Sequence, residues 1–249
     1  MVASAPHRAS PLQNRVTPFG EIVAIPERGT MMGNRGILHD GEQRVRRAWA
    51  GRLWICCVLD FQGRHDPVMA PGHYTRLFFL DEPTALAAGH RPCAYCRRDE
   101  YRIFRDAWAR GNPEAGLGTT PRAADIDRVL HGERLAPGGT KRLHPAHLDG
   151  LPDGVFVTAR PPHDRPEPAI RTPIDRTRLT RERSMDTRSE GNQQTDAYLV
   201  WRGAFWRWTP SGYQPATDAL DGAILLLTPP SIAAALAHGF VPRPPAGLT

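Results

Sequence analysis

The sequence from Tyr74 to Arg98 reads YTRLFFLDEPTALAAGHRPCAYCRR. Its apolar run at residues 77–80 predicts a short buried strand. Asp81 is a candidate N-cap for a following helix, because its carboxylate can accept hydrogen bonds from free backbone N–H groups, and Pro83 suits the first helical turn. The helix is expected to be short and alanine-rich and to end at Gly89. This unit leads directly into a pair of cysteines.

Cys93 and Cys96 form a Cys-x-x-Cys motif. On a tight turn before a helix, this spacing lets two thiolates converge on one metal ion. The other two cysteines, Cys56 and Cys57, lie in a buried strand predicted over residues 53–61. Adjacent cysteines and one Cys-x-x-Cys are poor spacing for a disulfide framework in a chain of 249 residues. A metal site in a reducing compartment is therefore expected, and thiolate ligands favour zinc, with iron as the minor option.

One cysteine of the predicted strand is a candidate third ligand. Alternation along the strand places Cys57 on the same face as Ile55 and places Cys56 on the opposite face. The sequence does not decide which of these faces meets Cys93 and Cys96. We favour Cys57, with Cys56 as the open alternative.

Residues 85–96, an alanine-rich helix followed by Gly-His-Arg-Pro-Cys-Ala-Tyr-Cys, resemble the Ada-like metal-binding domain. This family occurs in a DNA-repair protein and in relatives attached to nucleases. Its members have a strand, an alanine-rich helix and then G-[aromatic]-R-P-C-x-x-C, the second half of a four-ligand zinc site. The resemblance extends to residues 33–98 if the stretch from Gly33 belongs to it. It implies a zinc-binding unit with a role in DNA repair or modification.

The family's first ligand pair is Cys-x-x-x-Cys or His-x-x-x-Cys, and its nearest counterpart here ends at His39. The resemblance therefore implies His39 as a ligand. Four residues later stands Gln43, which cannot replace a thiolate, so Cys57 is the candidate for the missing ligand. In Ada itself a cysteine of the first pair accepts a methyl group from DNA. With His39 at that position, the same methyl transfer is not expected in this chain.

His39 has a second interpretation, as part of an enzyme site. His39, together with Asp40, Asn34 and Arg35, would line a pocket. The histidine would act as the general base, and the arginine would hold an anionic group of the substrate. The substrate would carry a phosphate or a nucleobase, and the reaction would be hydrolytic. No paired-carboxylate, Ser-His-Asp or metalloprotease signature narrows the reaction class. Whether the chain is an enzyme stays open, and a structural adaptor stapled by zinc is a third interpretation.

The chain is basic, with a net charge of +6 and a pI near 9.6. Nearly all the positive charge is arginine, which fits phosphate recognition and equally fits a GC-rich genome. DNA or RNA is therefore the expected partner. The candidates for nucleic-acid or anion binding are Asn34, Arg35, Arg91, Arg97, Arg98, Lys141 and Arg142.

The expected fold class is α+β, with small antiparallel sheets and short helices in an Ada-like zinc unit and a second β-rich lobe. Residues 1–20 are expected to be disordered, and residues 21–112 to form the metal-binding domain. Residues 113–159 read as a linker helix and the start of the second lobe. Residues 160–196 read as a mobile Arg/Pro-rich insertion, and residues 197–249 as a C-terminal β-hairpin and helix lobe.

The sequence gives no sign of a membrane or an export signal. The N-terminus has no apolar core after its basic residues, unlike a signal peptide. The apolar run at residues 223–227 is far too short to cross a bilayer. A soluble, cytoplasmic protein is expected, and the oligomeric state is not indicated.

Overall fold

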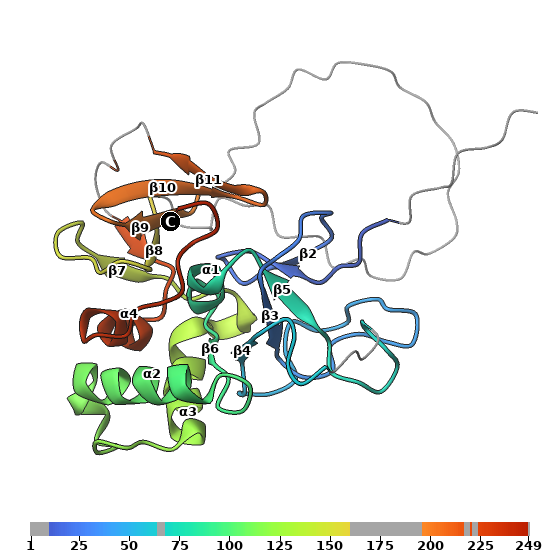
Figure 1. Ribbon diagram of the computed structural model, residues 1–249, viewed down its shortest axis with the longest axis horizontal. Helices are drawn as coiled ribbons and strands as arrows, with labels where there is room; N and C mark the ends of the chain where they lie inside the picture. The colour runs from blue at the N-terminus through green and yellow to red at the C-terminus, as the bar shows by residue number, and fades with distance from the viewer. Residues whose placement is uncertain (1–9, 64–67, 160–195, 217–219, 221–223, 249) are drawn as a thin grey trace, which may run out of the picture.

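The computed structural model describes residues 10–63, 68–159, 196–216, 220 and 224–248. Within these residues the chain forms two six-stranded sheets, four α-helices and two short 3-10 helices (Figure 1). The predicted α+β class is confirmed.

The first sheet has the strand order β2-β1-β5-β3-β4-β6. Its strands are β1 (Arg15–Val16), β2 (Ile22–Val23), β3 (Met31–Asn34), β4 (Ile55–Cys57), β5 (Leu77–Phe79) and β6 (Arg91–Pro92). The sheet is mixed rather than antiparallel, because β1 pairs parallel with β5 and β4 pairs parallel with β6. The strand predicted over residues 53–61 is shorter than expected, with Leu53 and Leu59 about half exposed on either side of β4.

The second sheet has the order β11-β10-β9-β8-β12-β7, and all its pairs are antiparallel. Its strands are β7 (His144–Ala146), β8 (Phe156–Thr158), β9 (Tyr198–Trp201), β10 (Ala204–Thr209), β11 (Gly212–Pro215) and β12 (Ile224–Leu226). Arg202 and Gly203 turn β9 into β10 and both have positive φ, as a tight two-residue hairpin requires. The predicted C-terminal hairpin is therefore present.

The helices are α1 (Glu82–Ala87), α2 (Arg98–Gly111), α3 (Ala123–Arg134) and α4 (Pro230–Ala237), with η1 (Pro113–Ala115) and η2 (Pro137–Gly139). The start of α1 is as predicted, since the Asp81 carboxylate accepts the Thr84 backbone N–H at 3.0 Å. The same carboxylate accepts the Tyr213 hydroxyl at 2.8 Å, which ties this cap to β11 of the second sheet. Gly89 follows with φ +87°, as its predicted role in stopping the helix requires.

The largest apolar core lies between α2, α3, α4 and the second sheet. Helix α2 contributes an aromatic stripe, with Phe104 and Trp108 fully buried. Helix α3 buries Ile126 and Leu130 in the same core. Helix α3, within the segment 113–159 predicted as a linker helix and the start of the second lobe, is part of the core that both halves of the described chain share.

Residues 10–20 differ from the predicted disordered segment. Strand β1 pairs with β5, and the Asn14 carbonyl accepts the Phe78 backbone N–H at 2.8 Å. Val16 is 2% exposed and belongs to the core of the first sheet. Burial of Val16 and pairing with the free edge of β5 therefore order this segment, although its polar composition predicts disorder. The rest of the predicted N-terminal segment, residues 1–9, and residues 160–195 of the predicted insertion lie outside the described residues.

Candidate metal centre

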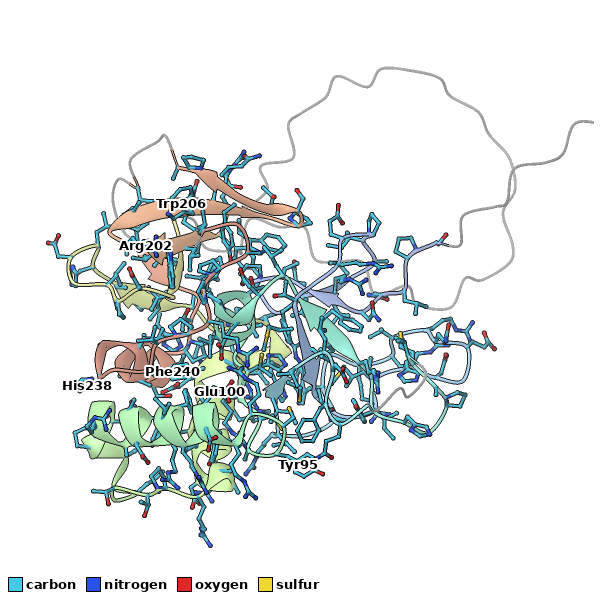
Figure 2. All side chains as sticks on the ribbon, viewed as in Figure 1. Tyr95, Glu100, Arg202, Trp206, His238 and Phe240 are labelled. Carbon is cyan, nitrogen blue, oxygen red and sulfur yellow. The ribbon has the colours of Figure 1, made fainter. Side chains whose placement is uncertain are left out.

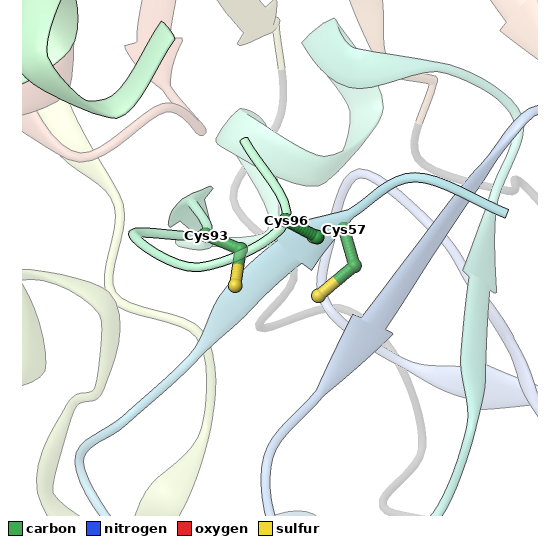
Figure 3. A group of neighbouring side chains, drawn as sticks. All are labelled: Cys57, Cys93 and Cys96. Atoms are coloured by element: carbon green, nitrogen blue, oxygen red, sulfur yellow. The ribbon is translucent and has the colours of Figure 1, made fainter. Parts of the chain in front are cut away.

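The pairing of β4 with β6 brings the cysteines of two distant segments together. In this parallel pair Cys56 is opposite Pro92, so the next residues, Cys57 and Cys93, are neighbours. The Cys56 carbonyl also accepts the Cys93 backbone N–H at 2.9 Å. A turn then carries Cys96 back over the strand end (Figure 3).

The sulfur atoms of Cys57, Cys93 and Cys96 all lie within 4.8 Å of one another. Zinc–sulfur bonds of about 2.3 Å in a tetrahedron place sulfurs about 3.8 Å apart, so small side-chain movements would close the three on one ion. All three are free thiols. The predicted grouping of Cys57 with Cys93 and Cys96 is present, and the alternative Cys56 is fully buried on the other face of β4.

Backbone N–H groups point at these sulfurs. The Tyr95 N–H donates to Cys93 Sγ at 3.4 Å, and the Val58 N–H donates to Cys96. Hydrogen bonds from the thiols of Cys57 and Cys96 lower the pKa of Cys93, with backbone N–H groups adding to the effect. The Cys57 thiol, which donates to Cys93, has its pKa raised. The turn thus stabilises negative charge on Cys93, the form of a cysteine that ligates a metal, whereas the pKa of Cys96, which also donates to Cys93, is raised.

The three cysteines form part of the wall of a pocket of about 260 Å³. Most of its other walls are apolar or aromatic, and Asn34 and Arg76 add polar groups. The remaining lining residues are Met32, Ile55, Val58, Leu59, Phe61, Tyr74 and Tyr95. The Phe61 and Tyr95 rings meet edge to face, with 5.1 Å between their centroids. Tyr95 lies at the periphery of the molecule (Figure 2) and is 58% exposed. Among the residues that the structure describes, no fourth Cys, His, Asp or Glu joins the group.

His39 is not part of this cluster. Its Nδ1 lies 2.6 Å from the Thr75 hydroxyl and its Nε2 lies 3.2 Å from the Ala70 carbonyl, with the side chain buried. Both ring nitrogens are therefore engaged in fixing the loop before β5. The prediction of His39 as a metal ligand is wrong for this group of cysteines, and its use as a catalytic base is not supported by this geometry.

Asp40 has a structural role in a tight turn. Its carboxylate accepts the Glu42 and Arg44 backbone N–H groups and pairs with the Arg44 and Arg46 side chains. The Arg44 N–H and the Arg46 guanidinium hold the pKa of Asp40 well below its ordinary value. A carboxylate saturated in this way does not orient His39, so the predicted catalytic pair is not assembled.

The predicted anion-binding residues do not form one surface. Arg91 and Arg97 are buried, and each is paired with a carboxylate, so neither can reach a nucleic acid. Only Arg98 and Arg142 of the predicted set are exposed. Asn34 lines the cysteine pocket, where its side chain accepts the Gly36 N–H at 2.6 Å. The other two predicted residues, Arg35 and Lys141, lie at a separate pocket.

Comparison of the chain with protein-family models, curated proteins and solved structures gives no match. In the described part of the chain, no helix has the length and apolar character needed to span a membrane.

Proposed function

We propose that this chain is a zinc protein in which Cys57, Cys93 and Cys96 hold the ion and the fourth coordination position opens onto the adjoining pocket. The observation that carries the proposal is the mutual approach of the three sulfurs to within 4.8 Å. Thiolates suit zinc, and three protein ligands with one open position are the arrangement of zinc sites that bind a ligand or activate water. The Ada-like motif at residues 85–96 supports the same metal.

The pocket walls support a ligand that carries a nucleobase, in DNA, in RNA or as a smaller molecule. Phe61 and Tyr95 offer aromatic surfaces for stacking, and bases stack on such side chains whatever their sequence. Asn34 and Arg76 place polar groups in the same wall. The exposed Arg98 follows the cysteine turn at the start of α2 and could contact a phosphate. A role in DNA repair or modification rests on the Ada-like resemblance alone.

The metal proposal predicts one zinc per chain, measured by elemental analysis of the purified protein. Cys57→Ser should lose the zinc, because it removes a ligand. Cys56→Ser is the matched control, because the neighbouring sulfur points away from the cluster and contacts Arg97 at 3.6 Å. That variant should keep the zinc. Equal loss from the two variants, or a wild-type protein that takes up neither Zn²⁺ nor Co²⁺, would refute the site.

Absorption spectroscopy of the Co²⁺-substituted protein tests the open position. Added imidazole should change the visible d–d bands if the fourth position is accessible. An unchanged spectrum would mean that the coordination is closed, which favours the structural-adaptor interpretation.

The nucleobase proposal predicts that Tyr95→Ala weakens binding of a labelled single-stranded oligonucleotide by about tenfold, since a stacked base contributes about 1–3 kcal/mol. Fluorescence anisotropy measures this affinity at fixed salt. Val241→Ala is the control, because Val241 is also an exposed apolar residue but does not line the pocket. Equal affinity in the wild type and both variants, or no binding at all, would remove the nucleic-acid part of the proposal.

A further inference from the structure

A second pocket, separate from the cysteines, is lined by three cationic side chains. Arg35, Arg134 and Lys141 face a cavity of about 40 Å³ beside Trp49 and Trp54. None of the described residues that line it is acidic. The pocket lies where the first sheet meets the end of α3 and the η2 turn, so it joins segments far apart in the sequence.

Two of these cations are fully buried against one aromatic ring. Arg35 and Arg134 are each 1% exposed, and the Cζ atom of each lies 4.0 Å from the Trp54 ring centroid. Cation–π attraction offsets part of the cost of burying each guanidinium. The two cations nevertheless repel each other, and arginine cannot relieve the repulsion by losing its proton.

The third cation adds to the same positive field. The Lys141 ammonium donates one hydrogen bond to the Ala87 carbonyl. Among the described residues this is the only hydrogen bond of the ammonium, which leaves two of its three N–H groups available to a ligand. Burial, together with the nearby Arg35 and Arg134, lowers the pKa of Lys141 to about 7.

The hydrogen bonds of the two arginines leave donors unused. Arg35 donates to the Gly20 carbonyl at 2.9 Å and to His90 at 3.1 Å, while its Nη2 has no partner among the described residues. Arg134 donates to the Gly89 and Arg52 carbonyls, and its Nε likewise lacks a partner in the described structure. Buried donors without acceptors are costly, so their persistence calls for an explanation.

The other buried arginines in the described part of the chain are each paired with a carboxylate. Arg91 binds both oxygens of Asp127, and Arg97 lies 2.7 Å from Glu82. Asp127 also acts electrostatically on Arg134, but its two oxygens are already bonded to Arg91. At the pocket beside Arg35, therefore, the described part of the chain buries positive charge without supplying a paired negative charge.

We propose that this pocket binds a tetrahedral oxyanion of the phosphate class. A dianion matches the two permanent charges of Arg35 and Arg134 better than a carboxylate does. Guanidinium forks and an ammonium are also the groups that recognise phosphate in proteins. The cavity has room for a group on the scale of a few water molecules. It therefore takes free phosphate or the terminal group of a phosphate ester whose remainder lies outside.

Thermal unfolding in phosphate and in chloride, at equal ionic strength, tests the site. Phosphate should raise the wild-type Tm by on the order of 5 °C at about 100 times its Kd. Lys141→Met removes one cation but keeps the aliphatic stem. Its Tm in chloride should equal or exceed that of the wild type, because a buried repulsion is gone, and most of the phosphate response should be lost. Arg142→Met, at the exposed neighbouring position, should keep the full response.

Two results would overturn the proposal. One is an equal phosphate response in the wild type and both variants, which is the general effect of a stabilising salt. The other is a Lys141→Met variant with a lower Tm in chloride and an unchanged phosphate response. That result would mean that Lys141 only stabilises the fold, through its hydrogen bond to the Ala87 carbonyl.

Calorimetric titration of the wild-type protein gives a test that needs no variant. Binding of inorganic phosphate alone identifies free phosphate as the ligand class, and binding of phenyl phosphate as well identifies an ester terminus. No heat of binding from either compound would overturn the site.

Discussion

Replacing Asp127 by asparagine is expected to lower the free energy of unfolding by about 3–5 kcal/mol. Arg91 donates from Nε and Nη2 to the two carboxylate oxygens at 2.8 Å, and both residues are buried. Asparagine keeps the shape of the side chain but removes the charge, so the Arg91 guanidinium is left buried and uncompensated. Urea denaturation followed by circular dichroism measures the loss.

Asp99→Asn is the matched control for this prediction. Asp99 pairs with Arg102 at 3.4 Å on the exposed face of α2, so its loss should change stability by less than about 0.5 kcal/mol. The double variant Arg91→Met, Asp127→Leu should recover most of the stability, because replacing both residues leaves no unpaired charge buried. Equal effects of Asp127→Asn and Asp99→Asn would contradict the buried pair.

The same pair bears on the metal site. Arg91 is in β6, two residues before Cys93, and Asp127 is in α3. The ion pair therefore anchors the strand that carries the cysteine turn to the shared helical core.

Local features of the site could be predicted because they depend on neighbours in the sequence. The cap at Asp81, the helix stop at Gly89 and the Cys-x-x-Cys turn each involve only a few consecutive residues. Alternation also separated Cys57 from Cys56 correctly. The convergence of Cys57 on Cys93 needed the parallel pairing of β4 with β6, which no pattern in the sequence indicated.

The prediction for His39 relied on a family motif whose two halves lie closer together than they do here. In this chain Thr75, just before β5, engages the histidine instead. Thr75 is 36 residues from His39, so no local sequence pattern indicates this hydrogen bond. The sequence therefore cannot distinguish such a histidine from a metal ligand.

The buried arginines were missed for a related reason. Arginine is mostly exposed in proteins, so a basic composition predicts a charged surface. Arg91 and Arg97 are buried because Asp127 and Glu82 reach them from other elements. Arg134, which completes the cationic pocket, is the last residue of α3, and no pattern in the sequence distinguishes it from an exposed arginine at a helix end.

Trp108→Ala is expected to lower the free energy of unfolding by about 3–5 kcal/mol. Trp108 is fully buried in the core between α2, α3, α4 and the second sheet. Alanine would leave a cavity that the packed helices cannot close. Because this core joins both halves of the described chain, urea unfolding should remain a single transition with a lower midpoint.

Trp108→Phe should behave differently, with a loss of no more than about 1 kcal/mol. Within the described residues the indole Nε1 has no hydrogen-bond partner, and a buried unpaired donor costs about 1–3 kcal/mol. Phenylalanine removes that donor and still fills most of the space, so the two effects nearly cancel. Ile103→Ala, at a half-exposed position of the same helix, should change stability by less than about 0.5 kcal/mol. If Phe and Ala at position 108 were equally destabilising, the indole N–H would have to make a bond that phenylalanine cannot replace.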